Sequence, residues 1–299
     1  MGYSVVTTVL AAAESYDLTD LDMVKDELSI DSSNGSDDSW LARAITQVSA
    51  AIARHCKRPF VPEVVQDAFD IEQDPYPYQT PGGFRALALS RWPVLAVVSV
   101  TQTLAPGVTQ TLTEGKDFRT DAETGQLLRL NAFTGVVTNW EAIPVTVIFV
   151  AGFGSLAVES HAIPASTPYH VTVDQAAVYA CTQAITYASG TPLTQVSANP
   201  VQGQFSVAAG VYVFNAADQG KMISFAYATL DVPADLVGVC LQLVTSRYAA
   251  KGRDPSLIQR ETPGVGIQRW WFGGTPGQNG QFPPDIEAAL NDYRVPSIA

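Results

Sequence analysis

The sequence predicts an α+β fold, and three observations lead to that class. Two regions, residues 17–60 and 233–251, space their apolar residues at the helical interval. Residues 63–153 instead hold short β-branched runs separated by Gly, Pro and Asn, which is typical of antiparallel strands. Residues 165–231 have only four charged side chains among 67 residues. We therefore expect an N-terminal helix pair and a late helix packed with a small antiparallel β element, an inserted sandwich-like all-β module and an extended C-terminal arm.

The N-terminal region predicts two helices joined by a polar turn. Thr19 can cap the first helix, with Asp22 three residues later as its capping-box partner. Ser36 can cap the second, with Asp37 and Asp38 in its first turn, and Pro59 prevents its continuation. The apolar stripe predicted for this second helix consists of Leu41, Ala44, Ile45, Val48, Ala51 and Ile52.

The middle of the chain predicts strands. Within the inserted module, residues 204–214 predict a hairpin around Ala209-Gly210, and Ile223, Phe225 and Tyr227 alternate with one face inward. The strands predicted before the module are 86–90, 95–104, 117–120, 126–130 and 145–150.

The last part of the chain predicts a buried helix, an arm and a final short helix. Residues 233–251 carry a broad apolar face, which ends at Gly252. The segment that follows is rich in Gly and Pro, and Pro284 opens the final helix. Large aromatic side chains on so irregular a segment are unfavourable in water and favour a partner's pocket, although the arm folding back over its own domain is the alternative. The candidate binding residues of this arm are Arg253, Arg260, Arg269, Trp270, Trp271 and Phe272.

Composition limits the function classes. The chain of 299 residues has a net charge of −12, which disfavours a groove that grips nucleic acid through its phosphates. No apolar run is long enough for a membrane span, and the N-terminus lacks the pattern of a signal peptide. The three cysteines are widely spaced, and we expect them to be small buried apolar residues in a protein of a reducing compartment.

Motifs for catalysis or metal binding are weak. The segment 31–38 fails as a calcium loop because Gly35 stands fifth and Ala42 occupies the twelfth position. His55, His161 and His170 show no metal-ligand spacing, and no nucleophile elbow, dinucleotide fingerprint or P-loop is present. We expect no enzyme activity, no cofactor and no metal; a hydrolase that uses Asp and His is the alternative, tested by whether two histidines meet a carboxylate cluster.

Four stretches, in order, resemble the phage head–tail connector (adaptor, or head-completion) family. They are the helix pair of 17–60, ending in Arg-Pro-Phe; LSRWPVLAVVSVT through VTVIFVAGFG, 89–154; the late helix and following segment, 232–266; and PPDIEAALNDYRV, 283–295. The chain departs from the family pattern in the insert, 165–231.

This resemblance implies a structural virion protein. It implies that copies assemble into a ring, most often twelvefold, below the portal protein, extend the DNA channel and offer a docking surface to tail or neck proteins. The protein is then located in the virion neck after synthesis in the host cytoplasm, takes part in genome packaging and ejection, and lets DNA pass without specific binding.

The predicted organisation has three parts: an adaptor core of 1–164 and 232–252, the inserted module of 165–231, and the arm with its terminal helix, 253–299. The alternative function is a phage β-module binding protein that contacts carbohydrate, host or capsid. In that case Tyr179, Tyr187 or Tyr212 could stack on sugars, whereas in the simpler interpretation they fill a small core.

Overall fold

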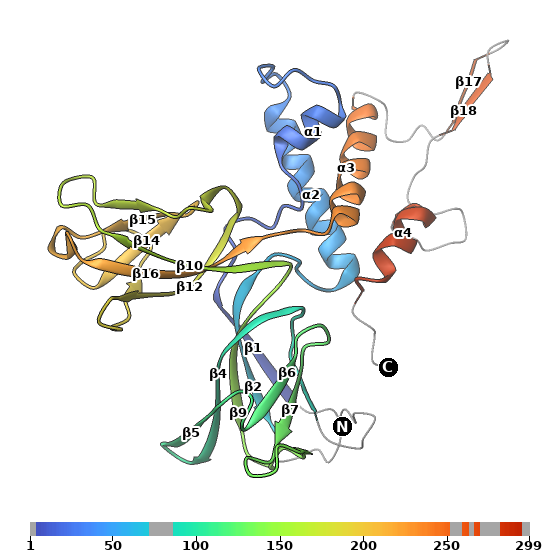
Figure 1. Ribbon diagram of the computed structural model, residues 1–299. Helices are drawn as coiled ribbons and strands as arrows, with labels where there is room; N and C mark the ends of the chain where they lie inside the picture. Colours follow the sequence, from blue (N-terminus) through green and yellow to red (C-terminus); the bar gives the residue numbers. More distant parts are fainter. Residues whose placement is uncertain (1–3, 72–85, 252–258, 263–265, 270–281, 295–299) are drawn as a thin grey trace. The chain divides into compact units, whose positions relative to one another are not determined.

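A computed structural model describes residues 4–71, 86–251, 259–262, 266–269 and 282–294 (Figure 1). The chain divides into two compact units. The β unit consists of Met1–Ser15 and Val61–Asp231, and the helical unit consists of Tyr16–Phe60 and Val232–Ala299. Helices and antiparallel sheets both contribute, so the predicted α+β class is confirmed. Among the described residues, no helix has the length and apolar character needed to cross a bilayer.

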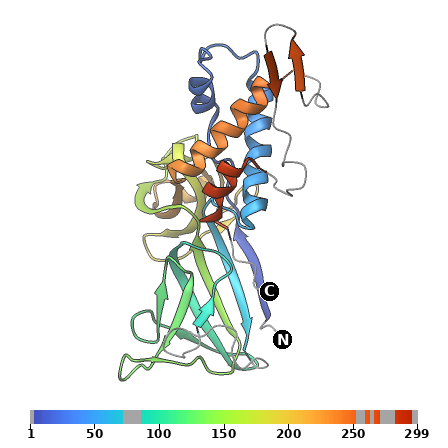
Figure 2. The ribbon, with the colours of Figure 1, turned by 90° about the vertical axis from the view of Figure 1, so that its right-hand side faces the viewer.

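The helical unit joins helices from both ends of the sequence. Figure 2 shows α3 packed along α2, and the shorter helices α1 and α4 also contact these two. Val24, Leu41, Ile52, Val244 and Leu290 are fully buried in its core. Its helices within the described residues are α1 (Leu21–Glu27), α2 (Asp38–Cys56), α3 (Ala234–Ala249) and α4 (Pro284–Asn291).

Both predicted N-terminal caps are wrong by one residue. Asp20, not Thr19, caps α1, because its carboxylate accepts a hydrogen bond from the Met23 backbone N–H at 2.8 Å. The Thr19 hydroxyl instead turns towards the Met23 sulfur at 3.5 Å. Asp37, not Ser36, precedes α2. The stripe predicted for α2 is confirmed, since all six of its residues are buried.

The first β sandwich of the β unit contains all five predicted strands. Its larger sheet has the order β1-β2-β9-β4-β5 and its smaller sheet β3-β7-β6, with β8 paired to β7. Val147 and Phe149 of one sheet and Leu127 of the other belong to a single buried cluster. The strands are β1 (Ser4–Ala11), β2 (Glu63–Asp70), β3 (Ala86–Ala88), β4 (Val94–Ala105), β5 (Val108–Leu112), β6 (Phe118–Asp121), β7 (Gln126–Leu130), β8 (Val137–Thr138) and β9 (Val145–Ala151).

The second β sandwich contains the predicted inserted module. Its sheets have the orders β10-β16-β12 and β11-β15-β14-β13, and they enclose an aromatic core that includes Tyr212, Phe225 and Tyr227. The elements are β10 (Gly154–Ala162), β11 (His170–Thr172), η1 (Ala176–Val178), β12 (Tyr179–Tyr187), β13 (Thr194–Gln195), β14 (Gln204–Ala208), β15 (Val211–Phe214), η2 (Ala216–Asp218) and β16 (Met222–Leu230).

The hairpin predicted at Ala209-Gly210 connects β14 and β15. Both turn residues have positive φ, 47° and 71°, as a two-residue hairpin of the type I′ family requires. The predicted inward alternation in β16 is also confirmed, since Ile223, Phe225 and Tyr227 are at most 1% exposed. The sheet of this sandwich starts before the predicted boundary at residue 165, because β10 pairs with β16 from Gly154 to Ala162.

Gly154 allows the start of β10, directly after β9, to lie close to β16. A Cβ atom at this position would lie 1.9 Å from the carbonyl oxygen of Thr229. Only glycine therefore allows β10 to approach β16 at the start of the pair. The Ala-Gly-Phe-Gly motif found in the sequence is the junction between the two sandwiches.

Candidate functional site

The predicted arm residues lie between α3 and α4. Arg260 and Arg269 are in a hairpin of two short strands, β17 (Gln259–Thr262) and β18 (Gly266–Arg269), in which Arg260 pairs with Gln268. Arg253, Trp270, Trp271 and Phe272 lie outside the described residues. The binding role of all six stays a prediction.

The end of α3, where this connection begins, is anchored on the start of α2. The Asp37 carboxylate accepts hydrogen bonds from the Tyr248 hydroxyl, at 2.7 Å, and from the Lys251 ammonium group. These two donors, Lys251 first, hold the pKa of Asp37 below its ordinary value. The Trp40 ring meets Tyr248 edge-on at 5.7 Å and also lies near the Lys251 ammonium group.

The other end of the connection is anchored through α4. Ile286 and Leu290 are at most 1% exposed. Phe282 packs edge-on against His55 with ring centroids 5.3 Å apart, and Tyr293 donates a hydrogen bond to Asp235 at 2.7 Å. The terminal helix predicted from Pro284 is thus confirmed as a helix, and it packs within the helical unit. The helix ends on both sides of residues 252–281 are thus anchored within the helical unit.

The three cysteines are free and buried, as predicted. Burial raises the pKa of Cys56 and Cys240 to about 11 and that of Cys181 to about 12. Such thiols are almost fully protonated at neutral pH, so they pack as small apolar groups and are poor nucleophiles.

The tyrosines of the second sandwich serve mainly its own core. Tyr212 is fully buried and shares a hydrogen bond of 2.8 Å with Thr182, so the sugar-stacking role considered for it is wrong. Tyr179 is partly buried against the same core. Tyr187 donates to Asp218 at 2.7 Å and lines a pocket of about 340 Å³ together with Lys221 and Met222.

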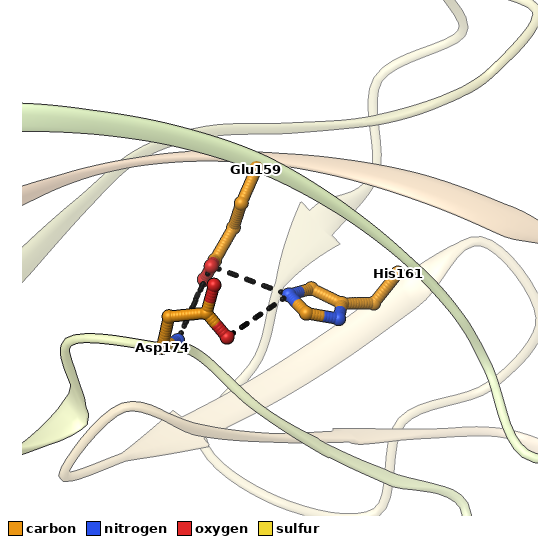
Figure 3. A group of neighbouring side chains, drawn as sticks. All are labelled: Glu159, His161 and Asp174. Atoms are coloured by element: carbon orange, nitrogen blue, oxygen red, sulfur yellow. Dashed lines mark hydrogen bonds and ion pairs between the residues drawn. The ribbon is translucent and has the colours of Figure 1, made fainter.

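The histidines differ in their surroundings. His55 packs on Phe282, and His170 is exposed in β11. His161 lies beside two carboxylates, with its Nε2 atom 3.2 Å from an oxygen of Glu159 and 3.9 Å from one of Asp174 (Figure 3). Sequence reasoning missed this cluster. The Glu-Ser-His spacing could have revealed the first two residues as sharing a strand face, but the approach of Asp174 depends on the tertiary fold.

No protein-family model matches the chain, and no curated protein matches it. Two solved structures that are similar to the chain come from gene transfer agent (GTA) particles. A chain from the neck of an empty GTA particle, computed with C6 symmetry, aligns with a TM-score of 0.41 and 12% identity, covering 100% of this chain and 98% of that one. A chain from the virion of a native GTA particle aligns with a TM-score of 0.40 and 12% identity, with the same coverage.

Proposed function

We propose that this protein is a structural component of a virion neck, a head-to-tail adaptor that forms a ring below the portal. The ring extends the DNA channel, presents the tail-docking surface and acts without enzymatic turnover. The resemblance of four sequence stretches to the connector family supports this function. Three of these stretches contain the pair α1–α2, the late helix α3 and the terminal helix α4.

The observation that carries the proposal is the anchoring of the two helix ends that flank residues 252–281. Hydrogen bonds to Asp37 hold one end, and the buried residues of α4 hold the other. The sequence between these two helices contains Trp270, Trp271 and Phe272, and such clustered aromatics are the residue types that dominate binding energy at interfaces.

Self-association is supported by the edge strand β1. Its eight residues, Ser4–Ala11, contain no charged side chain, and Val6 and Leu10 are 61% and 51% exposed. Monomeric proteins usually protect such an edge with charge, proline or a covering segment. An uncharged, exposed edge is suited to pairing with another chain, as a ring of identical subunits requires.

The acidic balance of the chain fits a channel through which DNA passes. Each subunit contributes a net charge of −12, and a ring multiplies that value. A surface of this sign repels phosphates and does not retain the duplex.

The test is a triple substitution, Trp270→Ala with Trp271→Ala and Phe272→Ala, in the full-length protein. We expect co-sedimentation with the matching portal protein to weaken at least 10-fold, because truncating aromatic anchors typically costs about 2 kcal/mol or more each. The circular dichroism spectrum should stay unchanged.

Phe133→Ala is the matched control, because Phe133 is a large aromatic that is 99% exposed in the β unit. This variant should bind the portal like the unmodified chain. Normal portal binding by the triple variant would exclude these three aromatic residues as the anchor, and a monomeric mass both alone and with the portal would exclude the ring.

A further inference from the structure

Strand β10 reverses the usual placement of polar and apolar residues. Glu159 pairs with Phe225 of β16 and His161 with Ile223, and directly paired residues project to the same face of a sheet. Phe225 and Ile223 are fully buried, so Glu159 and His161 lie on the core-facing side of β10. Val158, one residue earlier, projects to the opposite face and is 74% exposed. Ionisable groups on the inner side of a strand call for a compensating partner.

The three side chains converge on a small volume. Figure 3 shows the His161 ring directed at the carboxylates of Glu159, from the same strand, and Asp174, from the segment after β11. One ligand atom from each residue can be chosen so that all three lie within 4.8 Å of one another. The buried Nε2 of His161 has no hydrogen-bond partner among the described residues, although both carboxylates are near it.

Surrounding contacts fix the orientation of these groups. The backbone N–H of Asp174 donates to both oxygens of Glu159, at 3.1 and 3.2 Å. Phe225 meets the His161 ring edge-on, with centroids 5.9 Å apart. Outer contacts of this kind are what hold metal ligands in place.

The charge and the donor set favour a cation. Among the described residues, neither carboxylate forms an ion pair with a lysine or arginine. In a tetrahedral zinc site, ligand atoms about 2.0–2.2 Å from the metal are roughly 3.3–3.6 Å apart. The observed 3.2 Å fits that spacing, and the 3.9 Å separation closes with a small movement of Asp174, whose side chain is 77% exposed. An imidazole with two carboxylates suits zinc better than calcium or magnesium, which prefer oxygen ligands throughout.

We propose that Glu159, His161 and Asp174 bind one divalent transition-metal ion, with Zn²⁺ as the preferred ion, and leave a coordination position for water. The ion joins edge strand β10 to the segment after β11 and so stabilises the second sandwich. It has no part in the anchoring of α3 and α4.

The experiment uses full-length protein freed of metal by a chelator and titrated with Zn²⁺ in a calorimeter. We expect one Zn²⁺ per chain with a micromolar Kd and a rise in the Tm of the second sandwich. His161→Gln and Glu159→Gln should each weaken Zn²⁺ binding at least 10-fold. His170→Gln, an exposed histidine of the same sandwich, should leave it unchanged.

Two further measurements keep the assignment testable if a variant folds poorly. Co²⁺ bound to the unmodified chain should give no thiolate charge-transfer absorption, since the site contains no sulfur; such absorption would assign binding to a cysteine and overturn the proposal. Ca²⁺ and Mg²⁺ should not compete at equal concentration. Absence of Zn²⁺ binding below millimolar concentration would also overturn the proposal. In that case the ionisable residues on the inner face of β10 would serve to protect this edge strand from pairing with another chain.

Discussion

At the scale of single residues, Asp218 holds together one end of the second sandwich. Its carboxylate is fully buried and accepts hydrogen bonds from the Tyr187 hydroxyl at 2.7 Å, the Lys221 ammonium at 2.8 Å and the Gly203 backbone N–H at 3.0 Å. Burial raises the pKa of Asp218, but the three donors outweigh that effect, and the net pKa is lowered.

The substitution Asp218→Asn should reduce the free energy of unfolding by about 1–3 kcal/mol at pH 7, because the amide directs an N–H at one of three donors. A carboxyl group whose pKa is lower in the folded protein stabilises the folded state at pH values above its unfolded pKa of about 3.9. This stabilisation is lost as the pH falls through the folded-state pKa. The stability difference between the two proteins should thus be constant from about pH 5 to 8 and shrink below about pH 4.

Denaturant unfolding at several pH values checks this expectation. Asp121→Asn, at an exposed position in β6, is the control and should change stability little at any pH. A stability difference for Asp218→Asn that grows as the solution is acidified would contradict the assigned role of the charge.

At the scale of elements, the β14–β15 hairpin depends on the close fit of Gly210. This residue has φ +71°, and a Cβ atom there would lie 2.9 Å from the Ala176 Cα atom and 3.1 Å from Val173. Any larger residue at this position therefore destabilises the folded protein in two ways, through the backbone conformation and through the close contact with η1.

Gly210→Ala and Gly220→Ala separate these two effects. Gly220 has a nearly identical φ of +72°, but a Cβ atom there meets nothing within 4 Å. We expect Gly220→Ala to lower the free energy of unfolding by about 1 kcal/mol, from the backbone conformation alone. Gly210→Ala should lower it by about 2–4 kcal/mol. Thermal unfolding of both variants measures the difference, and equal losses would show that the contact with η1 relaxes freely.

The sequence predicted most elements because their signals are local. Apolar spacing identified α2 and α3, Pro284 located α4, and Ala209-Gly210 located the hairpin. The caps differed because Thr19 and Asp20 are both able to accept the hydrogen bond of the first turn, and tertiary packing decides between them. Strand β1 was not predicted, since a short uncharged run beside the N-terminus gives no periodicity that requires a strand.

The candidate sites were less predictable than the fold. The anchoring of the end of α3 depends on Asp37 meeting Tyr248 and Lys251, which are more than 200 positions away in the sequence. The approach of Asp174 to His161 depends in the same way on the packing of β10 against the segment after β11. Single-sequence patterns carry no information about such contacts, because they arise only once separate elements have packed.

At the scale of the whole molecule, the two units have separate hydrophobic cores. Leu41 is fully buried in the helical unit and Ile223 is fully buried in the β unit. Because these two residues lie in different compact units, damage at either one should first be seen in the unfolding signal of the unit that contains it.

Leu41→Ala and Ile223→Ala are the matched pair for this expectation, each removing buried apolar volume at a cost of about 2–5 kcal/mol. Leu41→Ala should lower the midpoint for loss of the helical circular dichroism signal, and Ile223→Ala should lower that of the β signal. Calorimetry and circular dichroism together check the result. Equal shifts of both signals in both variants would mean that the molecule unfolds as one cooperative body.

The arrangement of α2 and α3 has a consequence for synthesis on the ribosome. A nascent chain that has been translated as far as Asp231 contains every residue of the β unit but only helices α1 and α2 of the helical unit. The side chains of Leu41 and Ile52, which are buried in the finished protein, then stay exposed to water until α3 has been translated. Chains that terminate before α3 should therefore keep the apolar face of α2 exposed to water.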